Sequence, residues 1–135
     1  MHKFLLAMAV VAAGLQASVA DPVEDDISAV IAAQIDAFRA GDFNEAFSFA
    51  SDGIRAIFGT PENFGTMVER GYAMVIAPAE VQYTELRDEG GALMQRVLIR
   101  DGAGVWHALD YRMIKEDGAW RISGVELLGE PAVGA

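Results

Sequence analysis

Histidine is the side chain of this sequence best suited to acid–base chemistry near neutral pH. The chain has two histidines and no cysteine, and only His107 lies beyond the first twenty residues. Glu85 and Asp110 are the carboxylates that could orient its imidazole as a general base. Alternation along a strand puts Asp110 on the face opposite His107, whereas Glu85 falls on the same face. His107 and Glu85 are therefore the candidate catalytic residues.

The elements that must position this histidine are strands, because from residue 81 onward the apolar period is two. Segments 81–86 and 92–100 are the first two predicted strands, with a turn at 88–91 between them. A long hairpin follows over 104–128, joined at Glu116-Asp117-Gly118, because Asp-Gly between alternating segments is the strongest short hairpin signal. The second half of the chain is therefore predicted to be a four-stranded antiparallel meander.

One face of this meander gathers polar side chains among apolar ones. Leu109, Val97 and Trp120 lie on this face by alternation, and we expect it to face the helices. The candidate ligand-pocket residues are those that share it, together with a tyrosine from the preceding helix: Tyr83, Gln95, His107, Tyr111 and Tyr72. Two interpretations stay open. In the first, His107 and a carboxylate bind or deprotonate a small ligand. In the second, the histidine and the tyrosines are core residues whose polar tips find hydrogen-bond partners at the rim of the sheet.

Other kinds of site find little support in the residue types. One histidine and no cysteine make a structural zinc site implausible. The glycines occur at turns, and none forms a phosphate loop between a strand and a helix. Ser51 and Ser123 lack the strand–turn–helix setting of a nucleophile elbow. Neither a metal nor a cofactor is predicted.

Helices are predicted upstream of the strands. The first begins with Asp21 as N-cap and Pro22 as its first residue, and it ends at Gly41. It carries an apolar stripe at helical spacing: Val23, Ile27, Val30, Ile31, Ile35 and Phe38. Asp42 caps a second, shorter helix, with one more helical turn at 54–58. Thr60 followed by Pro61 opens the third.

The opposite face of the meander interleaves apolar side chains with arginines. Its candidate interface residues are Met94, Arg96, Leu98, Trp106, Arg112 and Ile114. An exposed apolar patch with tryptophan and arginine has the composition of an interface, so self-association is expected first. The alternative is that the arginine stems simply cover ordinary surface hydrophobic groups.

The first twenty residues read as a signal peptide. Lys3 precedes an apolar run over 4–15, and small residues end at Ala20. That run is shorter than the roughly 20 residues that a spanning helix needs, although a retained anchor is the alternative. Residues 21–135 then form a single periplasmic or secreted domain with a core at about 27–128. The net charge of −10 disfavours nucleic acid and anionic membranes as partners.

Helices followed by antiparallel strands make an α+β protein, with three helices on one face of a curved four-stranded meander. The stretch 117–124, DGAWRISG, resembles the final strand of the nuclear transport factor two-like superfamily of α+β rolls. The stretches 49–51 and 64–68, with Tyr72, resemble an uncharacterised bacterial family, domain of unknown function 4864. The resemblance covers roughly 27–128. It implies a conical pocket and dimerisation through the sheet. The superfamily includes ketosteroid isomerase, but no motif here matches its site.

Two functions are therefore expected as alternatives. The first is a non-enzymatic domain that binds a small ligand or a protein, and that self-associates as a homodimer through its sheet. The second is a small hydrolase or isomerase that uses His107 with Glu85 and with Tyr83 or Tyr111. Geometry discriminates between them, because an enzyme needs His107 within hydrogen-bond reach of a carboxylate or tyrosine in an open cavity.

Overall fold

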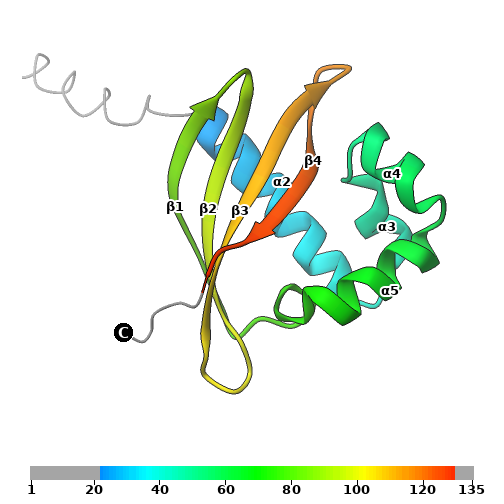
Figure 1. Cartoon of the computed structure of the whole chain (residues 1–135), viewed down its shortest axis with the longest axis vertical. Coiled ribbons are helices and arrows are strands. Elements are labelled where there is room, and N and C mark those ends of the chain that lie inside the picture. Colours follow the sequence, from blue (N-terminus) through cyan, green and yellow to red (C-terminus); the bar gives the residue numbers. More distant parts are fainter. Residues whose placement is uncertain (1–21, 130–135) are drawn as a thin grey trace, which may run out of the picture.

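The computed structural model describes residues 22–129, and within them helices precede a four-stranded antiparallel sheet (Figure 1). The predicted leader at 1–20, the predicted cap at Asp21 and the tail from residue 130 lie outside the described residues. The elements are α2 (Pro22–Arg39), α3 (Phe43–Ser48), α4 (Asp52–Phe58), α5 (Pro61–Gly71), the 3-10 helix η1 (Ala73–Val75), β1 (Glu80–Glu89), β2 (Ala92–Arg100), β3 (Trp106–Glu116) and β4 (Ala119–Leu127). The predicted α+β class is confirmed.

Side-chain caps begin the short helices where the sequence indicates. The side chain of Asp42 accepts a hydrogen bond from the backbone N–H of Glu45 across 3.0 Å at the start of α3. Thr60 caps α5 in the same way, ahead of Pro61. The single helical turn expected at 54–58 is instead a helix of its own, α4. It forms because the hydroxyl of Ser51 provides a new N-cap.

The sheet is a simple meander in the order β1-β2-β3-β4, as predicted. Its last hairpin turns at Asp117 and Gly118, whose φ angles of 51° and 82° are the left-handed values that an Asp-Gly turn supplies. The first hairpin turns at Gly90 and Gly91, which also have positive φ angles. Every connection within the sheet is therefore short, and consecutive strands lie side by side.

A β-bulge in β1 changes which side chains face inward. The register shifts between Tyr83 and Leu86, so Thr84 and Glu85 together lie opposite Arg96. Beyond the bulge, Leu86 takes the position beside Gln95, on the inner face. The prediction that Glu85 shares the inner face with Tyr83 is therefore wrong, because an extra residue reverses the alternation.

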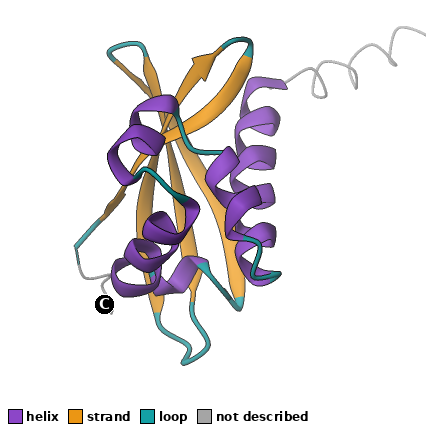
Figure 2. Cartoon of the chain, turned by 90° about the vertical axis from the view of Figure 1, so that its right-hand side faces the viewer, coloured by secondary structure: helices purple, strands orange, loops and turns teal. Residues whose placement is uncertain are grey.

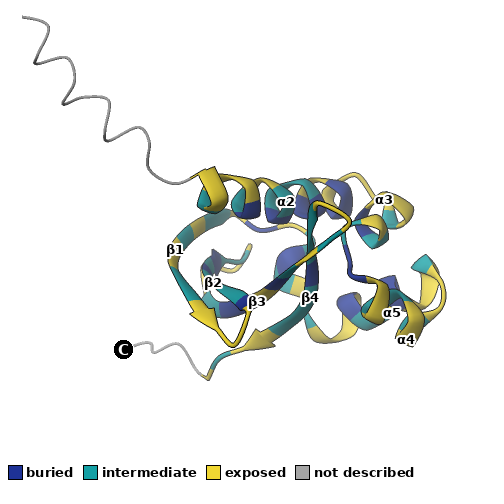
Figure 3. Ribbon diagram, turned by 90° about the horizontal axis from the view of Figure 1, so that it is seen from above, coloured by how far each residue is buried: buried dark blue, intermediate teal, exposed yellow. Residues whose placement is uncertain are grey.

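All the helices lie on one side of the sheet, and α2 runs along its concave face (Figure 2). Buried residues occur on α2 and on the strands that it faces, and they form the core between these elements (Figure 3). The segment between α3 and α4 also pairs with the sheet, because Ala50 forms a parallel bridge with Ile122 of β4. This bridge fixes α4 and α5 beside β4, at the end of the sheet where the space beneath the helices widens into a cavity.

Candidate functional site

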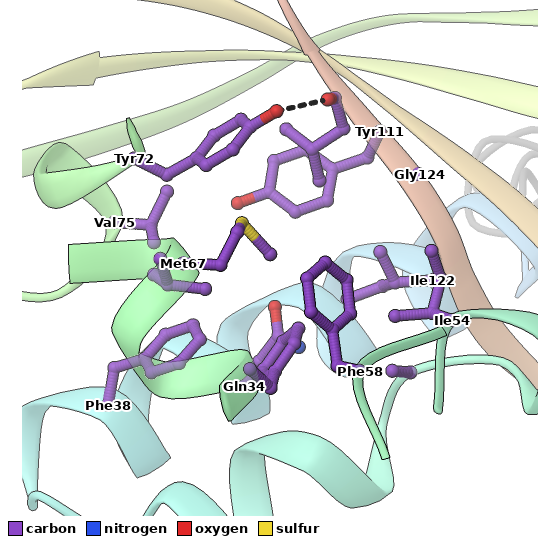
Figure 4. Close-up of a pocket in the computed structure, with 14 residues that line it drawn as sticks. Gln34, Phe38, Ile54, Phe58, Met67, Tyr72, Val75, Tyr111, Ile122 and Gly124 are labelled. Carbon is purple, nitrogen blue, oxygen red and sulfur yellow. Dashed lines mark hydrogen bonds between the residues drawn. The ribbon is translucent and has the colours of Figure 1, made fainter. Parts of the chain in front are cut away.

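A cavity of about 360 Å³ lies between the helices and the C-terminal half of the sheet (Figure 4). Side chains from α2, α4, α5, β3 and β4 line it, and most of them are apolar or aromatic. A volume of this size is typical of small-molecule sites in proteins. At the packing density of protein interiors, it accommodates a ligand on the order of a dozen non-hydrogen atoms. Side chains of residues 22–129 therefore do not fill the predicted roll interior.

Helical spacing explains how α4 and α5 present their side chains to the cavity. Met67 and Val68 follow Phe64 by three and four residues on α5, so all three lie on one face of the helix. On α4, Ile54 and Phe58 are four residues apart and both line the cavity. Three of these residues are half-buried and mark the accessible side of the cavity: Ile54, Phe58 and Met67.

A cluster of aromatic rings forms the floor of the cavity. The Phe64 ring lies 6.1 Å from that of Phe38, 5.3 Å from that of Phe47 and 6.0 Å from that of Phe58, measured between ring centroids. These separations are in the range at which aromatic pairs attract one another. Rings from α2, α3, α4 and α5 thus hold the helices in fixed positions around the space.

Three polar side chains interrupt the apolar wall. Tyr72 donates its hydroxyl hydrogen to the backbone oxygen of Val125 across 3.2 Å. The amide nitrogen Nε2 of Gln34 donates to the backbone oxygen of Ala46 across 3.1 Å. Among residues 22–129, neither Oε1 of Gln34 nor the Tyr111 hydroxyl has a hydrogen-bond partner. Both atoms point into the cavity in Figure 4.

The electrostatic character of the cavity follows from its lining. Of the described residues that line it, none is Asp, Glu, Lys, Arg or His. Burial, with a smaller contribution from Tyr83, raises the pKa of Tyr111 well above its ordinary value, so its hydroxyl stays protonated at neutral pH. The cavity can therefore donate and accept hydrogen bonds, but it offers no side chain that would act as a general base near pH 7.

Two of the five predicted pocket residues, Tyr72 and Tyr111, line this cavity, and the other three do not. Gln95 is fully buried, and its Nε2 donates to the backbone oxygens of Glu85 and Arg96 at the bulge. Tyr83 packs against the core, where burial and then the Asp36 carboxylate raise the pKa of its phenol.

His107 is the second residue of β3, opposite Ile99 of β2, and it does not line the cavity. Its Nε2 shares a hydrogen bond with Oδ2 of Asp101 across 2.8 Å. Oδ1 of the same carboxylate accepts from the backbone N–H groups of Ala103 and Val105. The hydrogen bond from His107, followed by that from Val105, lowers the pKa of Asp101 below its usual value. This arrangement fixes the loop, and neither His107 nor Asp101 lines the 360 Å³ cavity.

The candidate catalytic pair is not brought together. Glu85 lies on the outer face of the sheet, where its carboxylate contacts Arg87 at 2.9 Å and Arg96 at 3.6 Å. The bulge in β1 is the cause, because it turns Glu85 away from the face that holds His107. The carboxylate that does reach the histidine, Asp101, comes from the connecting loop.

From this geometry we predict the effect of replacing His107 by alanine. Ligand binding in the cavity should be unchanged, because neither His107 nor its partner Asp101 lines it. The melting temperature should fall, because Asp101 loses its side-chain partner. Calorimetry and equilibrium dialysis on the same protein check both parts. Loss of binding without any loss of stability would contradict this assignment and restore the histidine as a site residue.

The register places the predicted interface residues together on the outer face of the sheet, which no helix of the described chain covers (Figure 1). At the centre of this face, Asp110 is only 4% exposed. Arg96 donates to both of its carboxylate oxygens, at 2.6 and 3.3 Å, and Arg87 donates to one of them at 3.1 Å. The four apolar members were expected to be solvent-exposed but are half-buried: Met94, Leu98, Trp106 and Ile114. Arginine side chains cover part of this face.

The cavity residues that strand alternation missed come from the helices. Gln34 is the clearest signal, because it is a polar residue within the apolar stripe of α2, three residues after Ile31 and four before Phe38. A glutamine at such a position must either find a partner in the core or face a space that holds one. Within the described chain, Gln34 does both.

Comparisons with known proteins identify a family but no activity. A family model described as Domain of unknown function (DUF4864) matches residues 7–135. The search of curated proteins found no match. Within residues 22–129, no helix is long and apolar enough to cross a membrane. Nor do three or more potential metal-ligating side chains of the His, Cys, Asp and Glu types come together there.

Proposed function

Since the chain belongs to the family described as Domain of unknown function (DUF4864), a description that assigns no activity, we propose its role from the cavity. The protein binds a small, mainly apolar molecule in the space between α5 and the sheet, without transforming it. One observation carries this proposal: a largely apolar cavity of about 360 Å³ lined by aromatic rings that pack on one another. The fold also supports membership of the nuclear transport factor two-like superfamily.

Binding is favoured over catalysis because of where the ionisable side chains lie. A hydrolase or isomerase needs a general base or nucleophile within hydrogen-bond reach of its substrate. The imidazole of His107 is committed to Asp101, and the carboxylates of Glu85 and Asp110 are committed to arginines on the outer face. The cavity lining among the described residues supplies none of these groups.

Equilibrium dialysis against naphthalene tests the proposal. This probe is neutral, aromatic and small enough for the cavity. We expect saturable binding of one molecule per chain, with a dissociation constant below about 100 μM, as the ligand efficiency of small apolar compounds allows. Uptake that rises linearly to the solubility limit, without saturation, would mean that the cavity is not a binding site.

We also propose that two copies of the chain associate through the outer face of the sheet. The observation that favours this is an uncovered sheet layer bearing a tryptophan, Trp106, beneath the guanidinium of Arg100 at 5.9 Å. Tryptophan and arginine are the residue types most enriched at the centres of protein interfaces. This pair lies at the end of β2 and β3, and the other predicted interface residues extend from it along the same face.

Replacing Trp106 by glutamate should shift a dimer towards monomer and leave the fold intact. The substitution removes the ring that Arg100 covers and desolvates a carboxylate beside an arginine that already binds Glu80, at a cost of about 2–4 kcal/mol to association. Light scattering across a concentration series measures the shift, with circular dichroism as the control for folding. A wild-type protein that is already monomeric at high concentration would refute self-association.

The apolar run and small residues before Asp21 support a further proposal, that the protein is exported to the periplasm or secreted. We predict cleavage between Ala20 and Asp21. N-terminal sequencing of the protein recovered from the producing cell should then begin at Asp21. A sequence that begins at Met1 would contradict both the cleavage and the location.

A further inference from the structure

The cavity has hydrogen-bonding capacity that the described part of the protein leaves unused. The Tyr111 side chain is 1% exposed, and its hydroxyl has no partner among residues 22–129. Gln34 is 4% exposed and uses only its Nε2, so its Oε1 remains an unused acceptor within the same residues. Neither oxygen belongs to the fully enclosed, unpartnered side-chain atoms of the described residues, so both can be reached from the open space of the cavity. A polar atom in such a place takes its hydrogen-bond partner from whatever fills the space.

Both groups are held in place rather than free to turn away. Tyr111 lies in β3 between Gln95 and Val125 of the neighbouring strands, so its ring is fixed by the sheet. The amide of Gln34 is tied through Nε2 to the backbone of Ala46, which leaves Oε1 directed at the cavity. Figure 4 shows the two oxygens facing the same space from opposite walls. Fixed, unpaired groups of this kind are what orient a ligand in an otherwise apolar site.

We infer that the ligand of this cavity is an uncharged, mainly apolar molecule that presents a hydroxyl or carbonyl oxygen to the hydroxyl of Tyr111. A ligand hydroxyl can in addition donate to Oε1 of Gln34, so alcohols and phenols fit both groups. This inference rests on the proposed function, and it names the chemical class that the cavity selects.

Charge is the second selection rule. An ionised ligand would lose its hydration on entering a cavity whose described lining contains no counter-charge. Arg87 and Arg96 lie on the other side of the sheet and are already bound to Asp110. Arg55 is on α4 but does not line the cavity, and its guanidinium is paired with Asp52. The cavity should therefore reject fatty acids and other organic anions, although their hydrocarbon parts would fit.

A three-probe experiment tests this selectivity. Naphthalene, 1-naphthol and 1-naphthoate share a ring system and differ in the polar group. Equilibrium dialysis should be performed on the wild-type protein, on Tyr111→Phe and on Tyr83→Phe. The last variant is the matched control, because it removes a hydroxyl from the same sheet face outside the cavity. Because each variant is compared with the wild type for the same probe, differences in probe solubility cancel.

For the wild-type and Tyr83→Phe proteins, we expect 1-naphthol to bind and 1-naphthoate not to bind measurably. Tyr111→Phe should lower the affinity for 1-naphthol relative to that for naphthalene about tenfold, the value of one buried hydrogen bond. Its melting temperature should not fall, because the lost hydroxyl has no partner in the described residues.

The outcomes distinguish a failure of the proposed ligand binding from a failure of the inferred selectivity. If naphthalene and 1-naphthol both fail to saturate the wild-type protein, the proposed function itself is wrong. If they bind but Tyr111→Phe changes neither affinity, the cavity binds ligands and the selectivity inference fails. Binding of 1-naphthoate with an affinity equal to that of 1-naphthol would overturn the exclusion of charge. A clear drop in melting temperature for Tyr111→Phe would show that the protein itself partners the hydroxyl.

Discussion

Replacing Val68 by phenylalanine should abolish binding of naphthalene, weakening it by about a hundredfold or more, while the free energy of unfolding changes by less than about 1 kcal/mol. Val68 is 4% exposed and lines the cavity from α5. A larger ring at this position enters space that is already open instead of displacing neighbours. It removes the volume that a ligand would occupy. Equilibrium dialysis and chemical denaturation measure the two effects on one sample.

The same substitution at Val97 is the matched control. Val97 is fully buried on the inner face of β2 and does not line the cavity. A phenylalanine there must displace well-packed neighbours, so we expect a loss of roughly 1–3 kcal/mol of unfolding free energy. Equal destabilisation by the two substitutions would mean that no usable space lies beside Val68, and the cavity would lose its support.

Replacing Asp110 by alanine should lower the unfolding free energy at pH 7 by about 2–3 kcal/mol. The carboxylate is nearly fully buried and accepts three hydrogen bonds from Arg87 and Arg96. Charge-assisted hydrogen bonds of this kind are worth about 1.5–3 kcal/mol each. Removing the carboxylate also leaves the guanidinium groups of Arg87 and Arg96 without their buried partner. Both arginines keep their contacts with Glu85, so the loss of unfolding free energy is smaller than it would be for a fully buried group of three charges.

The contribution of Asp110 should also depend on pH in a defined direction. Burial raises the pKa of Asp110, but hydrogen bonds from Arg96 and then Arg87 outweigh it, so the pKa lies below its ordinary value. A carboxyl with a lowered folded-state pKa stabilises the protein above its unfolded-state pKa of about 4. That stabilisation is lost as pH falls through the folded-state pKa.

The difference in stability between wild type and Asp110→Ala should therefore be constant from neutral pH to about 5 and shrink below about 4. Denaturation curves at a series of pH values check this. Glu89→Ala is the matched control, because Glu89 also binds Arg87 but is about half exposed. It should cost no more than about 0.5 kcal/mol. A difference for Asp110→Ala that persists unchanged at the lowest pH would contradict the ion-pair explanation.

Local signals in the sequence predicted most of the fold. The caps at Asp42 and Thr60 and the Asp-Gly turn at 117–118 depend on residues within three or four positions of one another. The apolar stripe of α2 and the alternation of β2 and β3 likewise depend only on local spacing. These features require no knowledge of distant parts of the chain, so the class, order and connections of the elements could be predicted.

The candidate site depended on contacts that spacing does not encode. The prediction that Glu85 points inward was wrong because a bulge reverses the alternation of β1. The side-chain amide of Gln95, on the next strand, holds this bulge through a hydrogen bond to the backbone oxygen of Glu85. In retrospect, the apolar Leu86 three residues after Tyr83 is the visible break in the pattern. Strand alternation assigned Tyr111 to the inner face correctly. It cannot show whether side chains fill the space in front of that face.

Whether the inner face is filled depends on how far α4 and α5 stand from the sheet. That distance is set by the bridge between Ala50 and Ile122 and by the rings that surround Phe64. Apart from the contact between Phe58 and Phe64, these contacts join residues more than ten positions apart, so the pattern of a single sequence gives little access to them. Gln34 was the one local sign of the cavity, a polar residue in an apolar stripe.

The most direct test of the ligand-binding cavity is methyl NMR of the protein labelled at its methionine methyl groups, titrated with naphthalene. Met67 lines the cavity, whereas Met94 lies on the outer face of the sheet and serves as an internal control. We predict that the Met67 methyl signal shifts saturably with added naphthalene while the Met94 signal stays in place. A stationary Met67 signal, or a shift confined to Met94, would contradict the proposal that this cavity binds ligands.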